Sequence, residues 1–145
     1  MSKAIRRFFV ERHGASAVEF ALVAPVFLLL LLGIIELSRL VWTSHALYET
    51  AIATARCMAI PQLECEDGGV YDQKRSMSFA HAQAAVWIID LDSADITLAR
   101  NVSCSGLEGF SKATIEYRFE TVIPELLTSL AGGSRLKAEA CHADN

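Results

Sequence analysis

The sequence is short of positive charge and contains no recognisable catalytic, phosphate-binding or metal-binding motif. Lysine and arginine number 13 against 17 aspartates and glutamates. No basic stripe marks the C-terminal part, so nucleic-acid binding has no electrostatic footprint here. There is no Gly-rich phosphate loop, no G-x-S-x-G and no Cys-x-x-Cys. We therefore expect a protein that is not an enzyme, with no metal, no cofactor, no small-molecule substrate and no nucleic-acid partner.

Histidines and acidic residues do not gather in metal-binding patterns either. The four histidines, at positions 13, 45, 81 and 142, lie in different segments. The acidic run of Glu64, Glu66 and Asp67 lacks the spacing of an EF-hand loop and the glutamate that closes one. We interpret residues 61–74, which contain this run together with proline and glycine, as a solvated loop.

Charge is absent from one stretch altogether. No charged residue occurs from Phe20 to Ile35, and with its apolar flanks this 16-residue stretch reaches the roughly 20 residues that cross a bilayer as a helix. Pro25, near its start, is compatible with a membrane helix. Basic residues precede the stretch, which predicts a single-pass protein with a cytoplasmic N-terminus and an external C-terminal part. They are Lys3, Arg6, Arg7 and Arg12.

The residues that follow the uncharged stretch suit the outer boundary of a membrane. Glu36 and Arg39 are three residues apart, so they can pair on one helix face. Trp42 and Tyr48 are of the amphipathic aromatic type that is enriched where a helix leaves the bilayer. The sequence therefore predicts that the helix enters the external compartment near residue 40.

Cysteine is absent before residue 57, and all four cysteines follow the apolar run. An even number of cysteines in an external, oxidising compartment predicts two disulfides, with four free buried thiols as the alternative. Four cysteines allow three pairings, and we favour Cys57–Cys65 with Cys104–Cys141. The first pair closes a short loop at the end of the long helix, and the second ties together two strands of a small sheet.

Strand parity weighs against the second pair. Cys104 shares its parity with the apolar Ile96 and Leu98, whereas Cys141 shares its parity with the charged Lys137. Because successive side chains of a strand point to opposite faces, a regular pleat would put the two sulfurs on opposite sides of the sheet. The pairing therefore requires a bulge or a strand end between the apolar residues and Cys104.

Hydrophobic periodicity predicts an α+β fold. Apolar residues keep helical spacing beyond the membrane run with no glycine or proline before Pro61, so we expect one helix over residues 15–58. In the external part, 59–145, three- and four-residue steps predict a second helix, and alternation predicts an antiparallel sheet. The expected helix covers 75–91, the strands 95–104, 112–120 and 134–141, the hairpin connection 106–111, and a proline-bearing crossover 122–133.

The N-terminal segment admits two interpretations. A cleaved secretory signal does not fit, because the apolar run is too long and no small-x-small site follows it. An uncleaved single-pass anchor that carries an external adaptor or binding module explains the apolar run and the basic residues. It leaves Gly14, at the end of the basic segment, and Glu19, at the lip of the apolar run, without a role. A prepilin explains both residues.

Residues 6–40, RRFFVERHGASAVEFALVAPVFLLLLLGIIELSRL, resemble the prepilin-like leader of the Tad pilus system, and more closely the TadE-like family of pseudopilins. The resemblance extends over nearly the whole chain, through ARCMAI, SMSFAHAQAAVWI and KATIEYRFETVIPELL. It implies that a prepilin peptidase cuts between Gly14 and Ala15, after a leader of residues 1–14. Glu19 then becomes the fifth residue of the mature chain, followed by an aromatic residue, Phe20.

The resemblance also implies a function and a location. It makes the chain a minor pilin or pseudopilin needed to assemble the Tad, or Flp type IVb, pilus. The expected location is the bacterial inner membrane, with the C-terminal domain in the periplasm. The expected partners are the prepilin peptidase, other pilins or pseudopilins, the inner-membrane assembly platform and membrane lipid.

Overall fold

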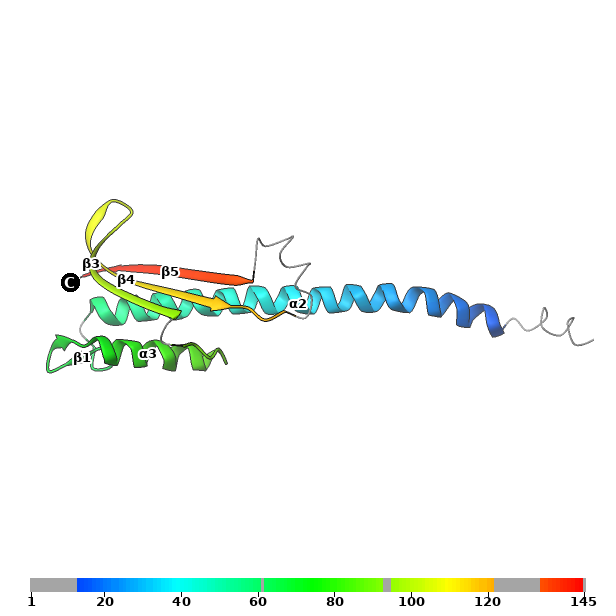
Figure 1. The fold of residues 1–145 in the computed structure, drawn as a ribbon, viewed down its shortest axis with the longest axis horizontal. Helices are drawn as coiled ribbons and strands as arrows, with labels where there is room; N and C mark the ends of the chain where they lie inside the picture. Colours follow the sequence, from blue (N-terminus) through cyan, green and yellow to red (C-terminus); the bar gives the residue numbers. More distant parts are fainter. Residues whose placement is uncertain (1–12, 61, 93–94, 122–133, 145) are drawn as a thin grey trace, which may run out of the picture. The chain divides into compact units, whose positions relative to one another are not determined.

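The computed structural model describes residues 13–60, 62–92, 95–121 and 134–144 of the chain (Figure 1). The chain divides into two compact units, Met1–Ser38 and Arg39–Asn145, called here the N-terminal and the C-terminal unit. Helix α2 (His13–Ala59) runs without interruption from one into the other. The long helix expected over residues 15–58 is therefore present: its described part begins at His13, and it ends at Ala59, one residue beyond the expected end.

In the N-terminal unit, the described residues form the first part of α2, which carries apolar side chains on every face. By length and composition this helix is apolar enough to cross a membrane, and the side chains of its most apolar window are not buried. Leu22, Leu29 and Ile34, for example, are each more than 60% exposed. A helix that is apolar on every face is stable when it is buried in a bilayer or among other helices. Pro25 lies inside the helix, as membrane helices tolerate.

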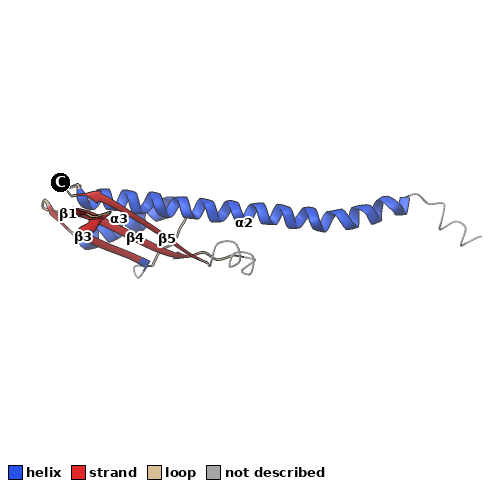
Figure 2. Cartoon of the chain, turned by 90° about the horizontal axis from the view of Figure 1, so that it is seen from above, coloured by secondary structure: helices blue, strands red, loops and turns tan. Residues whose placement is uncertain are grey.

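The C-terminal unit combines the rest of α2 with a second helix and two small antiparallel sheets, which is an α+β arrangement (Figure 2). Helix α3 spans Gln73–Val86. The three-stranded sheet has the order β3 (Ile96–Cys104), β4 (Leu107–Arg118), β5 (Arg135–Ala143), and β1 (Glu66–Asp67) pairs with β2 (Val70–Tyr71) as a separate hairpin.

The core of the C-terminal unit lies where the two helices and one face of the larger sheet meet. The helices present small residues there, which permits close packing, and the sheet supplies branched side chains. Two α2 threonines in this interface, Thr50 and Thr54, donate their hydroxyl hydrogen bonds to the carbonyls of Ala46 and Thr50, so they leave no unsatisfied hydroxyl. The core residues are Ala46, Leu47, Ala51, Ala80, Ala84, Ile89, Leu91, Ile96, Ile115 and Ala138.

The alternation predicted for the two later strands is confirmed. In β4, Ala113 and Ile115 are fully buried, and in β5, Ala138 is 1% exposed opposite Ile115. Burying a side chain as large as Ile115 contributes about 1.5–3 kcal/mol to stability. The inward face of these two strands therefore holds the sheet on the helices, as the sequence pattern indicated.

Three of the expected elements differ from the structure. The loop expected over 61–74 contains the β1–β2 hairpin, whose turn is formed by Gly68 and Gly69 with positive φ angles of 61° and 84°. The second helix was expected to reach residue 91 but ends at Val86. The segment 106–111, expected to be a connection, belongs mostly to β4, because Ser105 and Gly106 alone make the turn after β3. The expected crossover 122–133 lies outside the described residues.

Candidate functional site

The residues expected to direct processing and assembly lie on consecutive turns in the first described part of α2. Gly14 and Ala15 both have helical backbone there. Glu19 follows Ala15 by four residues, and positions four apart occupy the same face of a helix.

Glu19 and Phe20 present their side chains outward from the described part of the N-terminal unit. Glu19 is exposed, and Phe20 is 73% exposed. An exposed carboxylate beside an exposed aromatic ring, at the edge of an apolar helix, is placed to meet a neighbouring helix or the membrane boundary. Ala15, Glu19 and Phe20 thus lie in one short helical segment of the N-terminal unit. The four cysteines all belong to the C-terminal unit.

The four cysteines form two disulfides, Cys57–Cys65 and Cys104–Cys141, with Cα separations of 5.8 and 6.6 Å. This is the pairing favoured from the sequence. Cys57 and Cys65 are nearly fully buried, and their bond ties the end of α2 to the segment that leads into β1. Cys104 and Cys141 join the ends of two strands that both pair with β4.

A bulge in β3 removes the parity conflict at the second disulfide. Leu98 lies opposite the buried Ala113, but the register shifts before Val102, which lies opposite Phe110. Residues directly opposite each other in an antiparallel pair point to the same face. The extra residue therefore moves the even-numbered residues of β3 from the core face to the outer face, where Cys141 lies opposite Lys112.

Asn101 is the residue that allows this bulge. Its φ angle is 53°, in the left-handed region that asparagine tolerates better than other non-glycine residues. Its backbone N–H donates to Asp144 Oδ2 at 3.2 Å, so the residue after β5 satisfies an amide that the interrupted ladder leaves open. Asn101 is missed by hydrophobic periodicity, although asparagine is depleted in strands and was therefore a signal for a break.

A polar cluster fixes the bulge to the buried side of the sheet. The hydroxyl of Ser111, which is fully buried, donates to Asp144 Oδ1, and Arg100 Nε donates to Ser111 Oγ at 3.3 Å. The guanidinium of Arg100 also lies over the ring of Tyr71, 5.0 Å from its centroid. These contacts join β2, β3, β4 and the end of the chain, so the cluster serves the fold of this corner.

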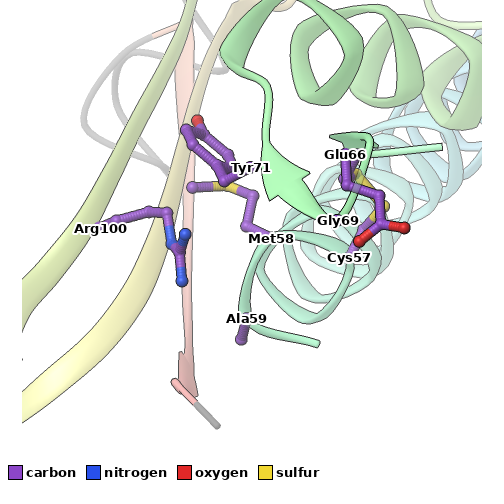
Figure 3. Close-up of a pocket in the computed structure, with 8 residues that line it drawn as sticks. Cys57, Met58, Ala59, Glu66, Gly69, Tyr71 and Arg100 are labelled. Atoms are coloured by element: carbon purple, nitrogen blue, oxygen red, sulfur yellow. A yellow bond between two sulfur atoms is a disulfide. The ribbon is translucent and has the colours of Figure 1, made fainter. Parts of the chain in front are cut away.

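Beside this cluster lies a small cavity of about 130 Å³, lined in part by the Cys57–Cys65 disulfide, Tyr71 and Arg100 (Figure 3). Burial raises the pKa of the Tyr71 phenol above 10.0, against smaller lowering effects of the Ser76 hydrogen bond and the Arg100 charge. Pockets that hold ligands usually measure about 300–1,000 Å³. The cavity is therefore too small for a substrate of ordinary size. Among the described residues no group of three or more histidines, cysteines and acidic residues is arranged to hold a metal ion.

An apolar surface patch lies where α3 ends beside α2. The rings of Trp42 and Trp87 meet edge to face with centroids 5.5 Å apart, and His45 lies 5.9 Å from Trp87. Trp42 is 59% exposed, Val86 73% and Ile88 95%. We call Trp42, Val86, Trp87 and Ile88 the tryptophan patch.

Ile88 occupies a position that normally belongs to glycine. Helix α3 ends in a Schellman motif, in which Ile88 N–H donates to the Ala85 carbonyl and Ile89 N–H to the Ala84 carbonyl. The motif requires a left-handed residue, and Ile88 has a φ angle of 61°. The left-handed conformation costs a residue with a Cβ about 1–2 kcal/mol, and it is especially unusual for a β-branched one. Sequence patterns do not predict this conformation, since an isoleucine inside an apolar run favours a continuing helix.

Comparison with known families finds a similarity in the first part of the chain. Residues 14–56 match the model of the TadE-like protein family, the family that the sequence resembles. The match starts at Gly14, covers the apolar run, and continues along α2 almost to Cys57; it spans less than a third of the 145 residues. Comparison with curated proteins and with solved structures finds no significant match.

Proposed function

We propose that this Tad-pilus-associated chain, similar to TadE-like proteins over residues 14–56, is a minor pilin or pseudopilin needed for assembly of the pilus. In this proposal residues 1–14 are a leader, 15–58 a membrane-spanning and extended helix, and 59–145 a periplasmic domain. The observation that supports it most is that the family match starts at Gly14 and covers the long apolar run of α2.

Cleavage after Gly14 is the first step of the proposal. A protease needs its substrate extended, so the helical backbone of Gly14 and Ala15 has to open before cleavage. Glycine lowers the cost of this opening, since it gains more backbone freedom than any other residue. A prepilin peptidase at the cytoplasmic membrane surface is the enzyme class that fits a site between basic residues and an apolar helix.

Glu19 has its role after cleavage. The cut leaves a new α-amino group on Ala15, whose pKa in an unperturbed setting is near 8, so it carries positive charge. A carboxylate one helical turn away can offset that charge within the chain or from a neighbouring subunit. An unpaired charge at the centre of a membrane helix costs about 2.5–3.5 kcal/mol. Because pairing Glu19 with the amino group lowers such a cost only when the two groups meet, it favours one register of the helix in an assembly.

The C-terminal unit fits the external end of such a protein. Its two disulfides suit an oxidising compartment, and the basic residues before α2 support a cytoplasmic N-terminus in the bacterial inner membrane. We infer that its work is contact with other pilins or with the inner-membrane assembly platform. We propose no catalytic role for it.

Loss of the Glu19 carboxylate tests the assembly role. In a strain that lacks the chromosomal copy, a Glu19→Ala variant should insert into the membrane as the parent does and restore few or no pili. Glu49→Ala is the matched control, because Glu49 is a partly exposed glutamate on the same helix, outside the apolar run. Normal pilus numbers with Glu19→Ala would remove the proposed role of the carboxylate, and loss of pili with both variants would show a general defect of the helix.

A further inference from the structure

We propose that the tryptophan patch is a second membrane contact, which lays the end of α3 on the outer surface of the bilayer that α2 crosses. The proposal rests on the membrane insertion of α2 given under the proposed function. It concerns Trp42, Val86, Trp87 and Ile88, which belong to two different elements of the C-terminal unit. The partner is the headgroup and upper acyl-chain region of a phospholipid bilayer.

The direction of α3 brings the patch to the membrane-proximal end of the C-terminal unit. Helix α3 begins next to the far end of α2: the Cys57–Cys65 disulfide ties that end to Cys65, and Asp72 N–H, at the N-cap of α3, donates to the Cys65 carbonyl at 2.9 Å. It then runs back along α2, as Figure 1 shows, and ends where Trp87 meets Trp42. Trp42 is only three residues after Arg39, the first residue of the unit, so Val86 and Ile88 lie beside the part of α2 that leaves the apolar run.

The chemistry of the patch suits the interface rather than water. Tryptophan rings are enriched at the level of lipid headgroups, where one end of the ring is apolar and the other is hydrogen-bonded. Both tryptophans of the chain are in this patch. Ile88 places an almost fully exposed apolar side chain beside them at a position where glycine would be unstrained, and strain of this kind points to a function outside the fold.

Charge does not carry the contact. Asp90 and Asp92 follow the patch closely and are exposed, and Glu49 lies on the neighbouring turn of α2. Acidic groups are repelled by anionic lipid, so the contact depends on ring and methyl burial in zwitterionic lipid. Binding at the surface should therefore be insensitive to moderate salt.

Depth-dependent quenching tests the contact, because each tryptophan can be observed alone. Trp42→Phe and Trp87→Phe each leave one tryptophan and keep an aromatic ring in place. The full chain is reconstituted in vesicles of phosphatidylcholine brominated either near the headgroup or at the chain end. In lipid brominated near the headgroup, we expect the emission of Trp87 to be quenched about as strongly as that of Trp42. In lipid brominated at the chain end, we expect the quenching of Trp87 to be several-fold weaker.

A probe at the opposite end of the unit serves as the control. Leu63 is 80% exposed and lies in the segment that Cys65 ties to the far end of α2. Leu63→Trp, in a chain with phenylalanine at both native tryptophan positions, should show no quenching. Quenching of this probe as strong as that of Trp87 would mean non-specific adsorption and would overturn the inference.

The outcomes separate this inference from the function on which it rests. Quenching of Trp42 with none of Trp87 would overturn the surface contact and leave membrane insertion intact. No quenching of either tryptophan would contradict insertion itself. If Trp87 became shielded from an aqueous quencher only when another pilin was added, the patch would be a protein interface and the lipid proposal would fall.

Ile88→Gly separates the role of this side chain from that of the fold. Glycine removes the strain at the end of α3, so the melting temperature of the C-terminal unit should rise. The rise should be about 4–8 °C for each kcal/mol gained in the free energy of unfolding. If the side chain is buried in lipid, quenching of Trp87 should decrease in the same variant. A more stable variant with unchanged quenching would exclude Ile88 from the contact.

Discussion

The Cα atoms of Cys104 and Cys141 lie 6.6 Å apart although their strands, β3 and β5, are separated by β4. Neighbouring strands are spaced about 4.8 Å, so two strands that flank a third are normally about twice that distance apart. Register shifts before and after Val102 bend the hairpin of β3 and β4 (Figure 1). The disulfide therefore depends on irregularities of the sheet, and it closes a long loop.

Loss of the two disulfides should destabilise the C-terminal unit unequally. In the loop-entropy model, opening the Cys104–Cys141 bond, with a sequence separation of 37, costs about 3–4 kcal/mol, and opening Cys57–Cys65, with a separation of 8, about 2–3 kcal/mol. Paired alanine substitutions avoid new polar groups. Denaturant unfolding followed by tryptophan fluorescence measures the difference, and a larger loss for Cys57–Cys65 would contradict the loop-entropy account.

The bulge gives a second prediction. Asn101→Val should lower the free energy of unfolding by about 1–2 kcal/mol, because a β-branched residue resists the left-handed backbone at this position. Both Asn101→Val and its control, Asn101→Gly, keep the N–H that donates to Asp144. Thiol titration should find more free Cys104 and Cys141 in the valine variant than in the glycine variant. Equal stability and equal thiol content would show that the bulge does not depend on this residue.

The raised pKa of Tyr71 predicts how the stability of the fold decreases at alkaline pH. Burial raises the pKa of its phenol above 10.0 in the folded state, so folding favours the neutral form. This contribution is fully present below pH 10 and is lost as the pH rises through the folded-state pKa, because the unfolded chain ionises first. Tyr71→Phe should therefore flatten the decrease in melting temperature above about pH 10. An identical slope in the two proteins would contradict partial burial of Tyr71 as the cause of its raised pKa.

Much of the fold follows from simple patterns in the sequence. The long helix and the buried faces of β4 and β5 are set by hydrophobic period, and the structure agrees with them. The end of α3 does not follow from hydrophobic period. Strand parity did require a bulge or strand end before Cys104 for the favoured pairing, but it did not predict that the bulge lies at Asn101. Each depends on one left-handed residue, Ile88 or Asn101, whose conformation is imposed by tertiary packing against its local preference.

The candidate processing site differs in kind from these tertiary features. In the proposal, Gly14 and Glu19 act through their spacing along one helix, so a linear pattern is enough to propose them. The tryptophan patch joins residues 42 and 87, which are far apart in the sequence, and it appears only when α3 has folded back along α2. The residues proposed for processing therefore follow from a linear pattern, whereas this surface follows only from the fold.

Processing should fail when Gly14 is replaced by a bulky residue. In Gly14→Trp the peptidase cleft would have to accept a large side chain next to the cut, so the chain should keep its leader and migrate more slowly in a denaturing gel. Gly33→Ala is the matched control: Gly33 lies within the apolar run, and a Cβ there has no atom within 4 Å. Normal cleavage of Gly14→Trp would remove glycine from the proposed recognition site.

The mature N-terminus of the wild-type protein is the most direct measurement. The protein is purified from membranes of a pilus-forming strain, and its first residue is determined by intact mass and N-terminal sequencing. A prepilin processed after Gly14 begins at Ala15, and the same strain without its prepilin peptidase should yield the longer form. A chain that begins at Met1 or Ser2 in the strain with an active peptidase would contradict processing and would make the protein an uncleaved membrane anchor.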